Sequence, residues 1–222
     1  MKLQAALAEL FGTAFLLAIV IGSGVMGERL AAGNTAIALL ANAIATGAGL
    51  YVLISALGPV SGAHFNPAVS VLMTLRGELP RKDLPIYVVM QILGAWLGVL
   101  VTHAMFELPL LQWSLKVRAG TPQMFSEFIA TLGLLATILL LARHQSSRIP
   151  AAVAAYITSA YWFTASTSFA NPAVTLARAC TDTFAGIRPA DVVGFIVAQF
   201  AAVLLCFVVS RRLNAPQCSA QP

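Results

Sequence analysis

The sequence predicts an all-α membrane protein with six transmembrane helices and two half-helices, arranged as an inverted repeat. Three observations lead to this fold class. Hydrophobic residues make up 59% of the chain and charged residues only 9%, whereas a soluble domain has about 25% charged residues. Apolar runs of the length that spans a bilayer recur along the 222 residues. The sequence Asn-Pro-Ala-Val occurs twice, at residues 66–69 and 171–174, each time just after such a run.

The expected spans lie near residues 3–26, 34–57, 84–106, 124–142, 149–167 and 190–210. The first run is longer than the roughly 7–15 apolar residues of a signal peptide and carries Glu9 in its middle, so we expect it to be retained. The last residues, 213–222, have no apolar period and are expected to form a short flexible tail.

The two halves of the chain share three landmarks in the same order. These are a Glu-Thr pair, an Asn-Pro-Ala motif and a glutamine. In the first half they are Glu9 with Thr13, residues 66–68, and Gln91. In the second half they are Glu127 with Thr131, residues 171–173, and Gln199. Each half holds three spans, an odd number, so the second half enters the membrane from the opposite face. We therefore expect one transmembrane domain over residues 1–222, with repeats at about 3–106 and 124–210 joined by a loop at 107–123.

The net charge of +5 is better explained by topology than by nucleic-acid binding. The chain has no basic run interleaved with aromatic residues to hold a phosphate backbone. With the N-terminus in the cytoplasm, eight of the 13 basic residues lie inside, and five lie outside: Arg29, Lys116, Arg118, Arg178 and Arg188. This bias follows the positive-inside rule and places both termini in the cytoplasm.

Each Asn-Pro-Ala motif predicts a helix that begins inside the membrane, because Asn is a good N-cap and Pro is favoured in the first turn. Nine residues follow each Asn, Pro67 to Leu75 and Pro172 to Cys180, which gives about 14 Å, half of a hydrocarbon core. Entering from opposite faces, the two N-termini meet near the midplane, where their dipoles repel cations. Amide donors and loop carbonyls there suit a neutral solute with hydroxyl groups.

With these motifs the sequence resembles the aquaporins, the major intrinsic protein family. The matching residues are Asn66, Pro67, Ala68, Asn171, Pro172 and Ala173, together with the Glu-Thr pairs and the glutamines, and the resemblance extends from Glu9 to about Arg211. It implies six tilted helices and two half-helices around one pore in each subunit of a homotetramer. It also implies a passive channel that needs no cofactor, no metal ion and no reaction.

The resemblance assigns roles to three further residues. It implies that Glu9 and Glu127 hold the irregular loops, whereas a transporter would use them as proton carriers. It implies that His64 lines the cytoplasmic approach to the pore; a merely packed histidine is the alternative. The cysteines at 180, 206 and 218 are too few for a metal cluster or a disulfide framework.

The chain departs from the family at the narrowest constriction. Most members have an arginine after the second Asn-Pro-Ala, where this chain has Val174. The other three constriction positions, carried over by resemblance, are Thr46, Ser159 and Ser168. Four small side chains predict a wide and neutral opening. In this respect the chain resembles the bacterial branch associated with arsenic resistance, which implies arsenite, glycerol or methylated arsenicals as solutes besides water.

Arg178 follows Val174 by four residues, on the same helix face and one turn nearer the outer mouth. Two interpretations stay open. Arg178 is either a displaced filter charge in the vestibule, or a helix-end residue that interacts with carbonyl groups or with Asp182.

We expect a passive channel in a bacterial inner membrane, and three alternatives stay open. A secondary transporter needs coupling-ion ligands near the broken helices, but no acidic residue adjoins either motif. A water-selective aquaporin needs a narrower filter. A hydrolase would pair Ser23 with His64 or His103, although the Gly-Ser-Gly at 22–24 is more simply a packing patch.

Overall fold

The computed structural model describes residues 3–213, and regular structure in this range is helical. The helices are α1 (Leu3–Leu30), α2 (Thr35–Ser61), α3 (Pro67–Leu75), α4 (Leu84–Met105), α5 (Thr121–Ala142), α6 (Ile149–Phe163), α7 (Pro172–Arg178) and α8 (Pro189–Leu213). A 3₁₀ turn, η1 (Ser146–Arg148), precedes α6. The part of the predicted tail beyond Leu213 lies outside the described residues. Lys2, one of the basic residues counted for the membrane orientation, also lies outside them.

Five of these helices, α1, α2, α4, α5 and α8, are long and apolar enough to cross a membrane, with mean hydropathies of 2.0 to 2.8. The chain is therefore a multi-pass membrane protein. The remaining predicted span, the fifth along the chain, is α6, which has only 15 residues and ends at Phe163 rather than at 167. Hydroxyl side chains explain the early end, because Thr164 to Ser168 contains four of them, and such residues compete for backbone hydrogen bonds.

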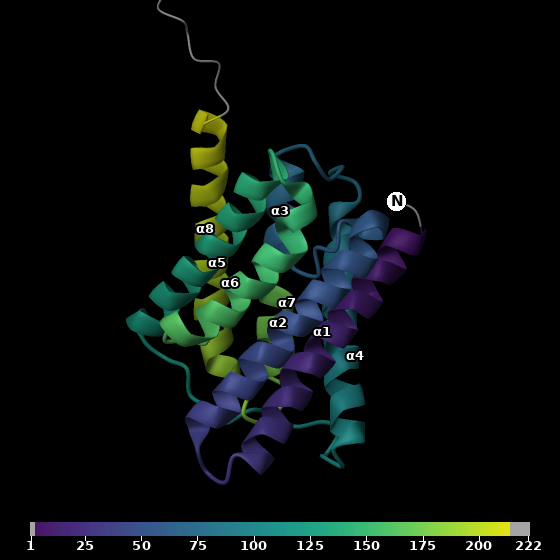
Figure 1. Cartoon of the computed structure of the whole chain (residues 1–222). Helices are drawn as coiled ribbons and strands as arrows, with labels where there is room; N and C mark the ends of the chain where they lie inside the picture. The colour runs from purple at the N-terminus through teal and green to yellow at the C-terminus, as the bar shows by residue number, and fades with distance from the viewer. Residues whose placement is uncertain (1–2, 214–222) are drawn as a thin grey trace, which may run out of the picture.

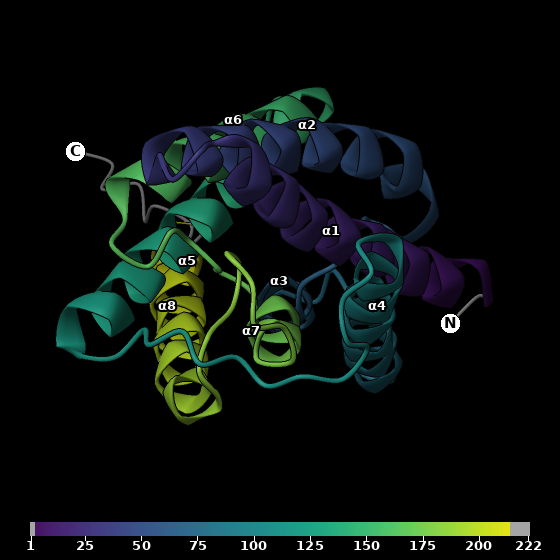
Figure 2. The same ribbon diagram turned by 90° about the horizontal axis from the view of Figure 1, so that it is seen from below.

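The helices form two similar halves. In the first, α1 packs against α2 and α4; in the second, α5 packs against α6 and α8. The halves meet where α2 packs against α6, and α3 and α7 lie in the middle, each in contact with both α4 and α8 (Figure 2). The start of α1 and the end of α8 lie on the same side of the molecule (Figure 1), as the inverted repeat requires.

Small residues allow the long helices to approach closely. A Cβ atom at Gly94 or Gly98 of α4 would collide with the α1 carbonyl oxygens of Leu10 and Ala14, respectively. The two halves contact each other by the same means, because a Cβ atom at Gly47 of α2 would collide with Thr158 of α6. This close packing brings the long helices together around the two half-helices.

Candidate functional site

The two half-helices begin at the predicted residues. The Oδ1 atom of Asn66 accepts a hydrogen bond from the Ala68 N–H at 2.9 Å, and that of Asn171 accepts one from the Ala173 N–H at 3.0 Å. In both helices proline occupies the first turn, where no donor is lost. The helix α3 ends at Leu75 as predicted, whereas α7 ends at Arg178, two residues earlier than predicted.

The asparagine amides tie the two half-helices together. The Asn66 Nδ2 group donates to the Ala170 carbonyl, and the Asn171 Nδ2 group donates to the Phe65 carbonyl, both at 2.8 Å. Each bond uses one of the two N–H groups of an amide. Because both asparagines line the same cavity, the second N–H group of each is available to a molecule inside it.

The loops before the half-helices have a strained backbone in equivalent places. Ala63 and Phe65 both have φ angles of 49°, and Ser168 and Ala170 have φ angles of 52° and 48°. These positions lie three residues and one residue before each asparagine. A left-handed conformation at a non-glycine residue costs about 1–3 kcal/mol and persists only where the surroundings enforce it. Something must therefore hold both loops.

Glu9 and Glu127 hold these loops. The Glu9 carboxylate accepts hydrogen bonds from the His64 and Phe65 N–H groups at 3.0 and 2.7 Å. The Glu127 carboxylate accepts bonds from the Phe169 and Ala170 N–H groups, both at 2.8 Å. Both carboxylates are fully buried. Their contacts match the scaffold role and leave little capacity for a coupling ion.

The paired glutamines complete each scaffold. Gln91 Nε2 donates to Glu9 at 2.7 Å and to the Ser70 hydroxyl at 2.9 Å. Gln199 Nε2 donates to Glu127 at 2.7 Å and to the Thr175 hydroxyl at 2.9 Å. The glutamines therefore link each carboxylate to the half-helix that it supports. The Ser61 hydroxyl, at 2.6 Å, is a further donor to Glu9.

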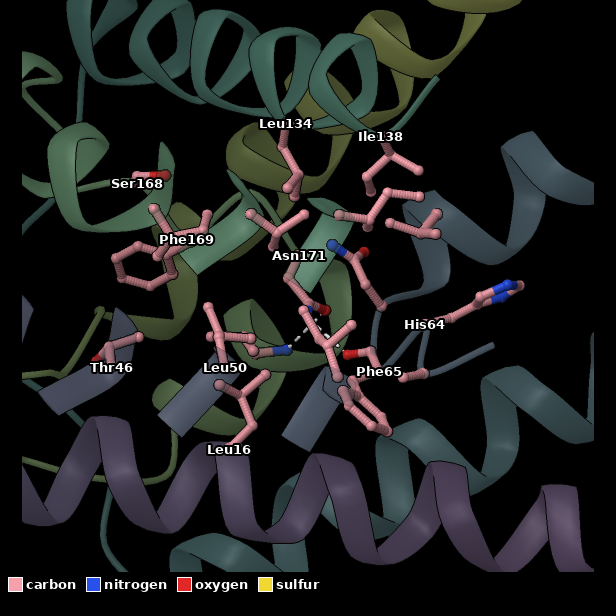
Figure 3. Close-up of a pocket in the computed structure, with 18 of the residues that line it drawn as sticks. Leu16, Thr46, Leu50, His64, Phe65, Leu134, Ile138, Ser168, Phe169 and Asn171 are labelled. Carbon is pink, nitrogen blue, oxygen red and sulfur yellow. Dashed lines mark hydrogen bonds between the residues drawn. The ribbon is translucent and has the colours of Figure 1, made fainter. Parts of the chain in front are cut away.

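The half-helices and loops enclose a cavity of about 240 Å³. We call its end at Glu78 the inner end and its end at Arg178 the outer end. In Figure 3, Asn171 lies at the centre, His64 on one side, and Thr46 and Ser168 on the other. The remaining wall is mainly apolar, formed by side chains that include Leu16, Val20, Leu50, Leu134, Ile138 and Val153. An apolar wall with a few polar groups favours small uncharged molecules that can exchange hydrogen bonds.

The structure brings three of the four predicted constriction residues to the cavity. Thr46, Ser168 and Val174 line it, and all three are buried. Ser168 is 3% exposed as a residue, and its buried hydroxyl has no hydrogen-bond partner among the described residues. A buried hydroxyl without a partner costs free energy, which a hydrogen bond to a molecule in the cavity would recover.

The prediction for Ser159 is wrong. Its side chain is exposed and its hydroxyl donates to the Tyr156 carbonyl at 2.7 Å. The cavity face of α6 instead presents Ile149, Val153, Ile157 and Tyr161, each four residues apart. Ser159 is two residues from Tyr161, which places it about 200° around the helix, on the opposite face.

Tyr161 is the residue that the sequence analysis missed. Its hydroxyl lies 3.2 Å from Thr46 Oγ1, and its side chain is buried. The four-residue spacing along α6 was a visible signal for this face. The outer part of the cavity therefore contains an aromatic ring in place of the small side chain predicted at Ser159.

His64 and Arg178 also line the cavity. His64 Nδ1 lies 3.0 Å from the Ser70 hydroxyl, and its ring centroid lies 5.3 Å from that of Tyr87. The Nε group of Arg178 donates to the Ala185 carbonyl. Asp182, the alternative partner, instead accepts a hydrogen bond from the Leu115 N–H at 2.9 Å.

The residues of the hydrolase alternative are bonded elsewhere. The Ser23 hydroxyl donates to the Ile19 carbonyl at 2.5 Å and accepts a bond from Asn42 at 2.8 Å. His103 Nε2 lies 2.8 Å from the Thr181 hydroxyl. These contacts give Ser23 a packing role, and they provide no base for it.

Comparisons with known proteins agree with this geometry. The model of the family described as "Major intrinsic protein" matches residues 1–163. Aquaglyceroporin AqpS from Rhizobium meliloti (strain 1021) is 52% identical over 209 residues, which cover 94% of this chain and 89% of that protein. Aquaporin Z from Brucella melitensis biotype 1 is 43% identical over 88 residues, covering 40% of this chain and 38% of that protein. The X-ray structure of the aquaglyceroporin from Plasmodium falciparum has the same fold, with a TM-score of 0.74 at 19% identity over 97% of this chain and 96% of that one.

Proposed function

Because the chain belongs to the major intrinsic protein family, we propose that its cavity is the pore of a passive channel for water and small uncharged solutes such as glycerol. One observation carries this assignment. Two half-helices meet inside the cavity, and their asparagines each bond the loop of the other while facing the lumen. The family is one of transport proteins, so no reaction is assigned to the site.

We extend the proposal to arsenite and methylated arsenicals. The outer constriction consists of Thr46, Tyr161, Ser168 and Val174 in this proposal. Three hydroxyl groups there can both donate and accept hydrogen bonds, while valine requires none. A neutral solute with several hydroxyl groups can exchange part of its hydration shell for these partners. An arginine in place of Val174 would add donors but fill the opening, as in the water-selective alternative.

The carboxylates weaken the transporter alternative. A coupled transporter needs free ligands near the broken helices, but the loops and glutamines occupy Glu9 and Glu127. Glu78, at the inner end of the cavity, forms an ion pair with Arg76 at 2.6 Å. The nearby acids therefore have structural partners.

We place the channel in a bacterial inner membrane as a homotetramer with both termini in the cytoplasm. The charge bias supports this orientation. Exposed apolar side chains on α1 and α2, among them Phe11, Phe15, Ile37, Ile44 and Tyr51, give each subunit a surface for a neighbour or for lipid.

Purified protein in liposomes tests the function directly. We expect stopped-flow light scattering to show water, glycerol and arsenite fluxes above those of empty liposomes. Glycerol flux should rise in proportion to its gradient and should not change when a proton gradient is imposed, because no ion is coupled to it. Saturation together with dependence on the proton gradient would instead establish a transporter.

Labelling of single cysteines tests the orientation. In a variant with Cys180, Cys206 and Cys218 replaced by serine, we expect Leu111→Cys to react with an impermeant maleimide on intact cells. We expect Ser147→Cys to react only after permeabilisation. Both positions are exposed, so accessibility reports the side of the membrane. Reaction of both on intact cells would contradict the inverted repeat.

A further inference from the structure

Two arginine side chains lie against the ring of Phe169 at the outer end of the cavity, and a lysine amine lies over the ring of Phe184. The Cζ atom of Arg178 lies 3.4 Å from the centroid of the Phe169 ring, and that of Arg118 lies 5.0 Å from it. Lys116 lies two residues before Arg118 on the loop between α4 and α5. We call Lys116, Arg118 and Arg178 the outer basic cluster.

Backbone carbonyls hold the outer basic cluster in place. Arg178 Nε donates to Ala185, Arg118 Nε donates to Gly186 at 2.8 Å, and Lys116 Nζ donates to Phe184 at 2.6 Å. Within residues 3–213, no carboxylate oxygen lies at ion-pair distance from any of the three cations. The carbonyl dipoles solvate these charges but do not cancel them.

The three cations are close enough to influence one another. Burial, followed by the charges of Arg118 and Arg178, lowers the pKa of the Lys116 amine to about 8, against an opposing effect of Glu28. Three basic groups therefore lie together at the outer end, where the charges of Glu28 and Glu127 oppose theirs. A cation that approaches the cavity from this end must pass the cluster before it reaches the asparagines.

Arg178 is the member of the cluster that faces the cavity. Its side chain is only 2% exposed and lines the cavity together with Phe169 and Val174. Only its Nε group has a hydrogen-bond partner in the described part of the chain. The ring of Phe169 and the Ala185 carbonyl fix the plane of the guanidinium, while its two Nη groups stay available to the lumen.

We propose that Arg178 supplies the cation-repelling charge of this pore from one helical turn beyond the constriction. This proposal rests on the proposed channel function. Val174 leaves the constriction open to larger neutral solutes, and Arg178 keeps a fixed positive charge at the entrance. Size selection and charge selection are thereby carried by different residues, four positions apart on α7.

Replacement of Arg178 tests the proposal. In wild-type liposomes with a clamped potential, we measure sodium and proton leak with fluorescent dyes, and glycerol flux by light scattering. We expect Arg178→Met to raise the cation leak about 10- to 100-fold, the effect of removing one unit charge several ångströms from the path at an effective dielectric constant near 20. We expect glycerol flux to stay within about twofold. Arg178→Lys, which keeps the charge, should leak like the wild type.

Arg188→Gln is the matched control. It removes a positive charge at the same end from a more exposed side chain that is paired with Asp191 at 2.8 Å, so its leak should equal that of the wild type. If Arg178→Met does not fold, Arg178→Gln gives the same test. An unchanged leak in a folded, glycerol-conducting neutral variant overturns the role of Arg178. Absence of glycerol and water flux in the wild type overturns the channel function itself.

Discussion

Val174→Arg lowers glycerol and arsenite flux about 10- to 100-fold, while water flux falls less. The expected change corresponds to roughly 1.4–2.7 kcal/mol added to the barrier. Val174 lines the cavity in a buried position near Thr46, Tyr161 and Ser168, so the longer side chain must occupy the lumen. It also brings a second guanidinium one turn from Arg178, and like charges four residues apart on a helix repel each other. Water needs the least space and is therefore the least affected.

Solute uptake in liposomes, normalised to the amount of folded protein, measures this effect. Val174→Leu is the matched control, because it adds volume without charge or new donors. We expect it to lower glycerol flux less than Val174→Arg does. If the glycerol-to-water ratio of Val174→Arg equals that of the wild type, the constriction lies elsewhere along the cavity.

The half-helices were predictable because their signal is local. An N-cap asparagine followed by proline specifies a helix start wherever it occurs, and α3 and α7 begin at these residues. The inverted repeat was also predictable, since the landmarks recur in order and the number of spans per half is odd. The scaffold role of Glu9 and Glu127 came from the resemblance to the family, and the contacts of both residues agree with it.

The constriction was only partly predictable. Ser159 was carried over by resemblance to the family, but α6 ends at Phe163 and its rotation brings Tyr161 to the cavity instead. The rotation of α6 depends on packing against α2 and α5, and the four-residue spacing along α6 was the local signal for its cavity face. The environment of Arg178 was unpredictable, because Ala185 and Arg118 approach it from other loops.

The Glu127 carboxylate accepts fewer hydrogen bonds than the Glu9 carboxylate. This difference predicts that substitutions of the two residues lower the stability of the protein by different amounts. Glu9 accepts hydrogen bonds from four donors: the Ser61 hydroxyl, the His64 and Phe65 N–H groups and the Gln91 amide. Glu127 accepts bonds from three, the Phe169 and Ala170 N–H groups and the Gln199 amide. Glutamine is nearly the same size as glutamate, but its NH₂ group cannot accept a hydrogen bond. Each substitution therefore leaves one oxygen to serve these donors.

We expect Glu9→Gln to lower the free energy of unfolding by about 2–6 kcal/mol, because two buried donors lose their acceptor at about 1–3 kcal/mol each. Glu127→Gln should lower the free energy of unfolding by less, since fewer donors depend on that carboxylate. Glu9→Gln should also reduce glycerol flux, because the strained φ angles at Ala63 and Phe65 depend on the hydrogen bonds to Glu9. Thermal unfolding in detergent, followed by the reaction of a thiol dye with buried Cys206, measures the order of stability. Glu28→Gln, at an exposed position near the end of α1, is the control and should unfold like the wild type. Equal melting temperatures for Glu9→Gln and the wild type would show that the first loop keeps its shape without the carboxylate.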